Sequence, residues 1–322
     1  MTNKIKLLTY NILIKELHKK YKKNIDSKLN IINYILAKKY DILVLQEVDW
    51  FDEFPKDKLE KIYYIQYDSP ENDLRYATYI FIKKTKFIID KNKIIKGIDL
   101  HKLKPLIWED LRHRGILGLK IIHKKTKEKI ILIGGHLEHM DNFKIGYPDQ
   151  GNNTIDKTKS IFNAIIKYLK YENNDNILIL LDSNEFYTNL IGLNNIKLDN
   201  YQPQSVNIKL DYNIDITFKD DGYPTCCIID FKKRKQNIYK SDIIGTNFNN
   251  KLTVHTDNSI GPFNNKLNSN NTYNFSGKKY PIIEDNGYSD HQPVIGYYNF
   301  NNNLSNTDFK SKKSLTFKNT TL

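Results

Sequence analysis

The feature that most limits how this chain can fold is a series of short apolar runs, each bounded by turn-rich, asparagine-rich segments. The runs at residues 42–45 and 177–181 read ILVL and ILILL. Each is far shorter than the roughly 20 residues that a membrane-spanning helix needs, and each has the length of a buried strand. The sequence therefore predicts a protein built largely from strands, without a membrane span.

Periodicity separates the predicted strands from two predicted helices. Strands are expected at residues 4–14, 42–45, 76–82, 116–123, 129–134, 176–181, 228–231, 241–245 and 293–298. Residues 27–39 and 158–171 instead space their apolar side chains three and four apart, as a helix with one buried face does. Two sheets packed face to face, with the helices outside, would bury all of these elements. The expected fold is therefore α/β (α+β), a four-layer αββα sandwich of two mainly antiparallel sheets.

The chain shows neither an internal repeat nor a change in composition before its last segment. One domain is expected over residues 1–300, and the polar residues 301–322 are expected to form a disordered tail. The two cysteines, Cys226 and Cys227, are adjacent, which excludes a disulfide framework and favours a reducing compartment. The start of the chain lacks the apolar stretch of a signal peptide. We expect a soluble intracellular monomer, in the cytoplasm or the nucleus.

The chain carries a formal net charge of +13 over its 322 residues. Such a charge would concentrate polyanions near the surface and speed their association, which favours nucleic acid as a partner. Lysine, asparagine and isoleucine are abundant throughout, however, as translation of an A/T-rich genome would also produce. Both explanations stay open. The basic clusters at residues 112–114 and 232–235 are expected to be solvated turns rather than phosphate clamps.

Polar side chains stand at the ends of the apolar runs, and this pattern recurs along the chain. The segments TYN, LQE, GGHL, DSN, SDII and SDHQP contain Asn11, Glu47, His136, Asp182, Asn184, Asp242, Asp290 and His291. A rigid sheet fixes such side chains, while the adjoining loop leaves them reachable. Carboxylate and amide oxygens suit Mg²⁺ or Mn²⁺, and neither the cysteines nor an H-E-x-x-H pattern indicates zinc.

Each motif alone also has an ordinary structural explanation. Asp-His and Asp-x-Asn sequences are common in solvated loops. Glu47 could cap a helix or strand, His136 could be a hydrogen-bonded core histidine, and Asn11 could be a turn residue. The order of all six motifs, each on the expected side of a strand, favours a single site instead.

In that order the six motifs resemble the signature of the endonuclease/exonuclease/phosphatase (DNase I-like) superfamily. The resemblance extends over residues 4–298, and the first, second and last motifs are the most specific. Two positions depart from the pattern, because Leu181 stands where glycine usually precedes the central aspartate and Glu185 follows Asn184. Neither departure removes a catalytic atom. The resemblance implies a DNase I-like sandwich and a metal-dependent phosphoric ester hydrolase.

The resemblance also implies roles in binding the metal and in activating the attacking water. Glu47 would bind Mg²⁺ (or Mn²⁺), with Asp290 as a ligand or close neighbour of the metal and Asn11 in the same polar cluster. Asp182 would orient and deprotonate the attacking water. Asn184 would assist Asp182 and contact the phosphate oxygens.

The remaining roles concern two histidines. His291 would contact the scissile phosphate and stabilise its developing charge, and His136 would donate a hydrogen bond to the phosphate or the leaving group. An aspartate would orient His291. Asp242 is favoured over Asp230, because Asp-Ile-Ile leads into a strand as the family's segment does. Asn11, Asn184 and His291 are the expected substrate-binding residues.

The motifs predict the reaction better than the substrate. The superfamily includes DNA-repair nucleases, RNA deadenylases, tyrosyl-DNA phosphodiesterases, sphingomyelinases and inositol phosphatases, and the segment HLE at residues 136–138 resembles that of the tyrosyl-DNA enzymes. The positive charge favours nucleic acid over a lipid or inositol phosphate. A non-catalytic scaffold of the same fold is the alternative from another class, although such a protein should have lost Glu47 or the terminal Asp-His pair.

Overall fold

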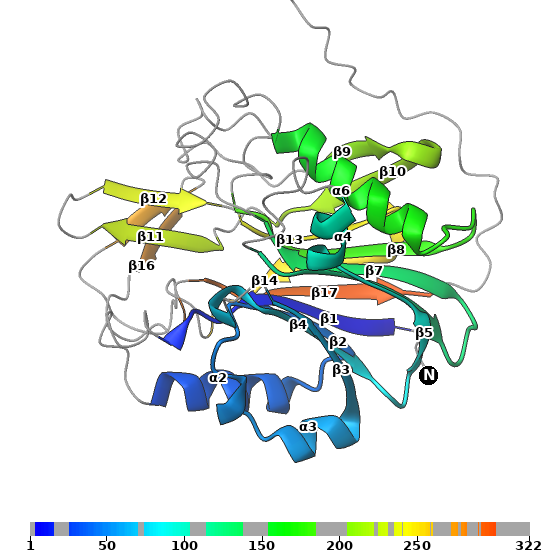
Figure 1. Ribbon diagram of the computed structural model, residues 1–322. Coiled ribbons are helices and arrows are strands. Elements are labelled where there is room, and N and C mark those ends of the chain that lie inside the picture. Colours follow the sequence, from blue (N-terminus) through cyan, green and yellow to red (C-terminus); the bar gives the residue numbers. More distant parts are fainter. Residues whose placement is uncertain are drawn as a thin grey trace, which may run out of the picture.

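The computed structural model describes residues 4–15, 26–69, 74–103, 114–137, 154–184, 205–221, 225–230, 235–239, 241–257, 259, 272–275, 278–281, 289 and 291–300. Within these residues, two large sheets pack face to face (Figure 1). The first has the order β14 (Leu252–Thr256), β17 (Val294–Asn299), β1 (Lys4–Asn11), β2 (Ile42–Gln46), β4 (Thr78–Lys83), β3 (Tyr63–Asp68). The second has the order β5 (Phe87–Lys96), β6 (Ile116–His123), β7 (Lys129–His136), β8 (Asn176–Asp182), β13 (Asp242–Thr246), β10 (Ile214–Lys219), β9 (Ser205–Leu210).

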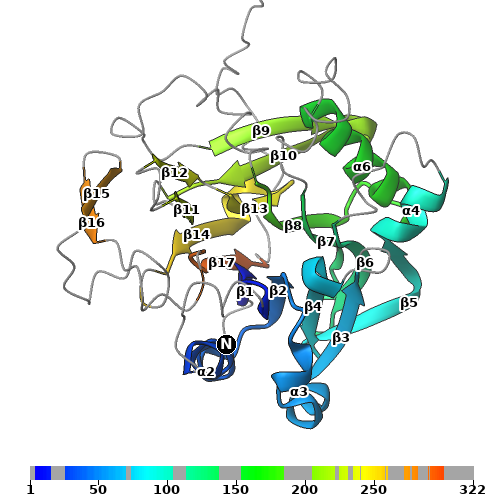
Figure 2. The same ribbon diagram turned by 60° about the vertical axis from the view of Figure 1, so that its left-hand side comes forward.

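Helices cover the outer faces of both sheets. Helices α2 (Asp26–Lys38) and α3 (Lys56–Ile62) lie on the six-stranded sheet, and α4 (Gly97–Leu103) and α6 (Thr154–Tyr168) lie on the seven-stranded sheet (Figures 1 and 2). Short 3₁₀ helices occur at Phe51–Glu53, Leu74–Tyr76, Asp211–Asn213 and Asn249–Lys251. Two small hairpins stand apart, β11 (Cys226–Asp230) with β12 (Lys235–Tyr239), and β15 (Thr272–Phe275) with β16 (Lys278–Pro281). The layers form the expected αββα sandwich.

Side-chain alternation along the central strands builds the apolar layers. In β8, Leu178 and Leu180 pack into the core between the two sheets, whereas Ile177, Ile179 and Leu181 pack against α6. Successive strand residues point to opposite faces, so a strand buried on both sides must be apolar throughout. This requirement explains the uninterrupted ILILL run.

Two parallel strand pairs bring four strand ends to one edge of the molecule. Helix α2 crosses between the parallel strands β1 and β2, and α6 crosses between β7 and β8, while the other pairs are antiparallel. The carboxyl ends of β1, β2, β7 and β8 therefore meet at one edge of the sandwich. The sheets approach closely there, since a Cβ added at Gly134 would lie 2.9 Å from the Val44 side chain. Such proximity requires glycine.

The expected fold is confirmed, with informative differences at the strand ends. Strands predicted to stop at 134 and 181 run on to His136 and Asp182, so these two residues are held by the sheet itself. Strands β3, β5, β9, β10, β12, β14, β15 and β16 and helices α3 and α4 were not predicted. The proposed tail at residues 301–322 lies outside the described residues. No helix in the described part of the chain has the length and apolarity needed to cross a membrane.

Candidate active site

The strand registers bring three of the motifs side by side. His136 at the end of β7 pairs in register with Asp182 at the end of parallel β8. Asp182 pairs in turn with Asp242, the first residue of antiparallel β13. On the facing sheet, Asn11 ends β1 beside Gln46, which ends β2. Residues distant in the sequence thus meet at one sheet edge because strand pairing determines their positions.

Asp182 lies at the centre of this cluster. Its side chain is fully buried, and its Oδ2 accepts a hydrogen bond of 2.8 Å from Asn11 Nδ2. The same oxygen lies 3.4 Å from His136 Nε2 and 3.8 Å from His291 Nε2. The Asn184 backbone N–H donates to Oδ1 at 3.1 Å. Burial tends to raise the pKa of Asp182, but the two imidazoles and these donors outweigh it and hold the pKa below the ordinary value.

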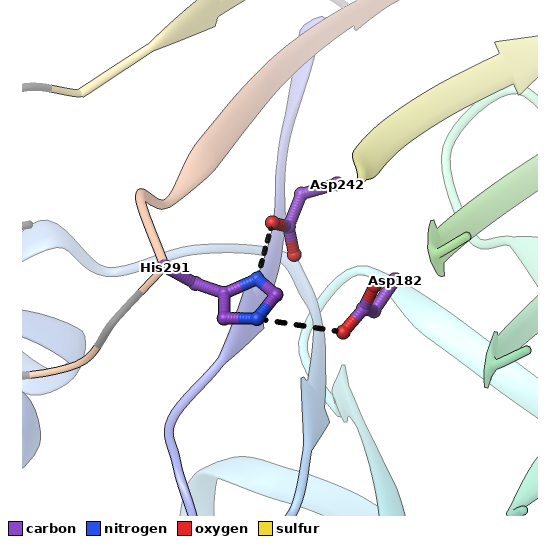
Figure 3. A group of neighbouring side chains, drawn as sticks. All are labelled: Asp182, Asp242 and His291. Atoms are coloured by element: carbon purple, nitrogen blue, oxygen red, sulfur yellow. Dashed lines mark hydrogen bonds and ion pairs between the residues drawn. The ribbon is translucent and has the colours of Figure 1, made fainter. Parts of the chain in front are cut away.

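His291 is held by Asp242. Its Nδ1 lies 2.8 Å from Asp242 Oδ2, and its Nε2 faces Asp182 (Figure 3). An ionised carboxylate can only accept, so Nδ1 is the donor whenever Asp242 is charged. Burial raises the pKa of Asp242, opposed by the charge of His291 and its hydrogen bond. Asp242, the aspartate favoured from the sequence, is in contact with His291.

Two hydroxyl groups brace this pair. The Ser241 hydroxyl donates to Asp242 Oδ2 at 3.2 Å and lies 3.4 Å from His291 Nδ1. The Thr225 hydroxyl accepts hydrogen bonds of 2.9 Å from the backbone N–H groups of both Ser241 and Asp242. Because these bonds fix the backbone at the start of β13, the carboxylate has little freedom to move away from the imidazole.

Ser289 joins the end of β1 to the segment that precedes β17, the strand paired with β1. Its hydroxyl donates to the Asn11 carbonyl at 2.7 Å and accepts from the His291 backbone N–H at 3.2 Å. Asn11 and His291 are thereby positioned by one side chain, although 280 residues separate them (291 − 11). Asn11 Oδ1 also accepts from the Leu13 backbone N–H at 3.0 Å, which orients its Nδ2 toward Asp182.

Glu47 directly follows β2 and lies on the far side of His136 from Asp182. Its Oε1 is 4.0 Å from His136 Nδ1, and its Oε2 accepts a 3.3 Å hydrogen bond from the Ile14 backbone N–H. The Glu47 side chain keeps 14% of its surface exposed, whereas His136 is almost fully buried. His136 therefore fills the space between a partly open carboxylate and a closed one.

Backbone strain gathers at this edge. Leu13, Glu47 and Asn184 have φ values of 65°, 58° and 45°, in the left-handed region that residues other than glycine rarely adopt. Each follows a strand that ends at the site. Unfavourable backbone conformations persist where surrounding contacts enforce them, and they concentrate at functional sites.

The described oxygen donors fit a hard divalent cation. Among described residues, Asp182, Asp242 and His291 offer ligand atoms within 4.8 Å of one another. Asp242 Oδ2 and His291 Nδ1 bind each other, so these two atoms are not available to a metal ion. Glu47 instead presents a partly exposed carboxylate of the type that Mg²⁺ or Mn²⁺ prefers. The other expected ligand, Asp290, lies outside the described residues.

The Asn184 side chain is held at the end of β7, and its contact with a phosphate stays a prediction. Its Nδ2 donates to the Leu137 carbonyl, so the side-chain amide is turned toward the end of β7. Its backbone N–H is used on Asp182. In this arrangement Asn184 fixes the turn that follows β8 and orients the central carboxylate.

The sequence reasoning missed an arginine and a tyrosine next to His136. Arg114 was expected in a solvated turn, but it is buried, with its guanidinium carbon 3.9 Å from the Tyr76 ring centroid. The Tyr76 ring meets the His136 ring edge-on, with 6.4 Å between centroids. Arg112 and His113 lie outside the described residues. A cation placed on an aromatic face beside a candidate catalytic histidine adds positive potential to the site.

Solved structures share this arrangement of sheets, whereas no protein-family model and no curated protein matches the sequence itself. A truncated TDP2 from Caenorhabditis elegans aligns with 92% of this chain and 97% of its own, at 17% identity and a TM-score of 0.53. ANGEL2, described as a 2',3'-cyclic phosphatase, aligns over 92% and 95%, at 15% identity and a TM-score of 0.58. The endonuclease/exonuclease/phosphatase from Bacteroides vulgatus aligns over 91% and 98%, at 12% identity and a TM-score of 0.54. The chain therefore has the fold of the endonuclease/exonuclease/phosphatase (DNase I-like) superfamily.

Proposed function

We propose that this protein is a Mg²⁺- or Mn²⁺-dependent phosphodiester hydrolase that acts on nucleic acid. One observation carries the proposal: the buried Asp182 carboxylate lies between His136 and His291, and Asn11 donates a hydrogen bond to it. Packing alone does not require two imidazoles and an amide donor around a buried carboxylate. Perturbed titrating groups with specific partners at one sheet edge are typical of catalytic sites.

We assign to Asp182 the role of orienting the attacking water and accepting its proton. Its lowered pKa keeps the carboxylate ionised across the working pH range, and its Oδ2 faces both imidazoles. A carboxylate of low pKa is a weak base, so its main contribution is to hold the water in line and to accept its proton as the new bond forms. Asn11 and Asn184 keep this carboxylate in one orientation through their hydrogen bonds.

We assign to His291 and His136 the role of stabilising the negative charge on the phosphate. With Nδ1 bound to Asp242, His291 keeps Nε2 as the atom that can meet a phosphate oxygen. His136 lies on the opposite side of Asp182 Oδ2 and can donate to the phosphate or the leaving group. Donors fixed before the reaction stabilise developing negative charge without reorganising.

We assign to Glu47 and Asp290 the role of binding the divalent cation. When bound, such a cation neutralises phosphate charge and helps to orient the substrate. The partial exposure of the Glu47 carboxylate and its backbone bond to Ile14 support this assignment, because they present a fixed oxygen ligand at an open face. Asn11 belongs to the same polar cluster through Asp182.

Nucleic acid is the favoured substrate class. The net charge of +13 supports a polyanion, and binding should then weaken steeply as salt rises. A second structure of ANGEL2, similar to this chain at a TM-score of 0.56, contains adenosine-2',3'-vanadate, a nucleoside derivative. The sequence segment HLE keeps a tyrosyl-DNA end among the substrates to be tested.

A substrate panel with a matched variant tests the proposal. The protein and Asp182→Asn are incubated with Mg²⁺ and single-stranded DNA, abasic DNA, poly(A), phosphotyrosyl-DNA, sphingomyelin and inositol phosphates. We expect turnover of at least one nucleic acid that Asp182→Asn and EDTA each abolish. Turnover of only sphingomyelin or inositol phosphates would refute the substrate class. A lack of turnover on every substrate would favour the scaffold alternative.

A further inference from the structure

A lysine-lined groove runs along the outer surface of α6, away from the candidate active site. It encloses about 980 Å³ between α6, α4, β5 and the end of β9. We call it the α6 groove. Its lysines are Lys93, Lys159, Lys167, Lys170 and Lys209, and its carboxylates are Asp156 and Asp211. Five positive charges thus face two negative ones across a single surface.

The positive charge of the groove is only partly offset by nearby carboxylates. Among the residues described, none of its five lysines forms an ion pair with a carboxylate. Lys93 lies in the irregularity of β5 between Ile89 and Ile94, and such a bulge can re-aim a side chain. Partial burial and the positive charge of Lys170 lower the pKa of Lys93. A bound anion would relieve this repulsion.

Exposed apolar side chains accompany the lysines. Tyr168 at the end of α6 is 46% exposed, and Leu103 at the end of α4 is 69% exposed. Proteins that hold single strands combine a basic groove, which follows the phosphates, with aromatic rings on which bases stack. A double helix hides its base faces, so an exposed tyrosine between lysines fits an unpaired strand.

The direction of α6 connects this groove to the catalytic edge. Because β7 and β8 are parallel, the helix between them must start at the edge where His136 and Asp182 lie and return to the opposite edge. Lys159 lies near that start, and Lys167 follows about 12 Å further along the helix at 1.5 Å per residue. The groove therefore leads away from the candidate active site across the outer layer.

We propose that the α6 groove binds single-stranded nucleic acid and holds the part of a substrate strand that extends beyond the scissile phosphate. The assignment of that strand as substrate rests on the proposed function. Binding by the groove does not, because its residues take no part in the candidate catalytic site.

Binding of labelled oligonucleotides to the whole protein tests the groove. Fluorescence anisotropy is measured with a 20-nucleotide and a 4-nucleotide single strand in EDTA, so that hydrolysis cannot interfere. We expect Lys93→Gln/Lys167→Gln/Lys170→Gln to raise the Kd for the 20-mer at least 10-fold at low salt. Loss of three phosphate contacts should also reduce the slope of log K against log salt by about 2. Tyr168→Ala should weaken the 20-mer without changing that slope, and the 4-mer should be little affected by either change.

The matched control removes the same charge elsewhere. Lys58, Lys61 and Lys125 are exposed and lie outside the groove, so Lys58→Gln/Lys61→Gln/Lys125→Gln should change the Kd less than 3-fold. Equal losses in both triple variants would refute the groove and assign binding to overall charge. Groove-dependent binding of polyglutamate or phosphatidylserine vesicles as tight as that of the 20-mer would refute the choice of nucleic acid.

Hydrolysis of a small phosphodiester separates this inference from the proposed function. With Mg²⁺, turnover of bis(p-nitrophenyl) phosphate should be the same in the groove triple variant and the unmodified protein. If hydrolysis is normal and the triple variant still binds the 20-mer tightly, the groove assignment alone fails. If no phosphodiester is hydrolysed while groove-dependent binding persists, the proposed function fails and the groove stands.

Discussion

His291 Nδ1 lies 2.8 Å from Asp242 Oδ2, and this contact joins the segment that precedes β17 in one sheet to the first residue of β13 in the other. We therefore expect the two residues to contribute to turnover as one unit and not independently. Asp242 is fully buried and His291 nearly so, which makes their separation costly.

Substitution of either partner should consequently affect turnover through the same imidazole. We expect His291→Ala to lower kcat roughly 100-fold or more, because it removes charge stabilisation used mainly in the transition state. Asp242→Asn should also lower kcat, and the double variant should be barely worse than the worse single variant. Steady-state kinetics of all three variants on the best nucleic-acid substrate check this.

Asp230→Asn is the control for that cycle, since Asp230 was the other aspartate suggested by the sequence. It should leave kcat within about 2-fold of the unmodified protein. Multiplicative effects of His291→Ala and Asp242→Asn would show that the two residues act independently.

Metal binding should be measurable without turnover. A cation that binds only the folded protein raises its stability by RT ln(1 + [L]/Kd), about 2.7 kcal/mol at 100 times Kd. We expect Mg²⁺ or Mn²⁺ to raise the Tm of the unmodified protein and EDTA to reverse the change and abolish turnover. Glu47→Gln should lose most of the Tm increase. The exposed Glu60→Gln serves as its control, and full activity in EDTA would contradict a metal-dependent reaction.

Asn11 offers a test of the environment around Asp182. Its Nδ2 donates a 2.8 Å hydrogen bond to the ionised carboxylate, and such charge-assisted bonds contribute roughly 1.5–3 kcal/mol. Asn11→Ala should therefore lower kcat about 10- to 100-fold. Asn11→Asp should be worse, because it replaces the donor with a second negative charge.

The control for Asn11 is an equally conservative change far from the site. Asn250→Asp alters an exposed residue of the 3₁₀ helix Asn249–Lys251 and should not change kcat. If Asn11→Asp retained normal turnover, the hydrogen bond to Asp182 would have no part in the reaction.

Local pattern was sufficient for the central strands and for the residues at their ends. The apolar runs that became β2 and β8 are buried on both faces, so their composition alone reveals them. Polar residues follow each run, and this pattern identifies Glu47 and Asp182 as site candidates from the sequence alone. Their convergence follows from the parallel pairing of β1 with β2 and of β7 with β8, which the structure shows.

The edge strands and the supporting contacts left no comparable signal. Strand β5 is interrupted between Ile89 and Ile94, and its lysines and asparagine obscure the alternation on which a strand prediction depends. Arg114 looked like one member of a solvated basic cluster, because nothing local shows that Tyr76 will lie under it. Burial that depends on distant residues is a property of the fold and cannot be read from a short segment.

Asp68 provides a stability test that is independent of catalysis. This carboxyl ends β3, is almost fully buried, and accepts hydrogen bonds from the backbone N–H groups of Gly97 and Ile116. Burial raises its pKa to about 7, against the opposing effect of these two donors. The ordinary carboxyl value near 3.9 applies in the unfolded chain.

The sign of the resulting pH dependence follows from proton counts. Between about pH 4 and pH 7 the folded protein holds a proton on Asp68 that the unfolded chain has lost, so this residue makes the free energy of unfolding fall as pH rises. The loss amounts to at most about 4 kcal/mol and is complete above pH 7.

Asp68→Asn keeps an acceptor oxygen for the two N–H groups and cannot ionise. We therefore expect Asp68→Asn to stabilise the protein at pH 8 relative to the unmodified chain, with the difference shrinking toward zero near pH 4. Urea unfolding midpoints at both pH values measure it, with the exposed Asp52→Asn as control. A variant that is less stable than the unmodified protein at pH 8 would mean that the two backbone donors hold Asp68 ionised in the folded state.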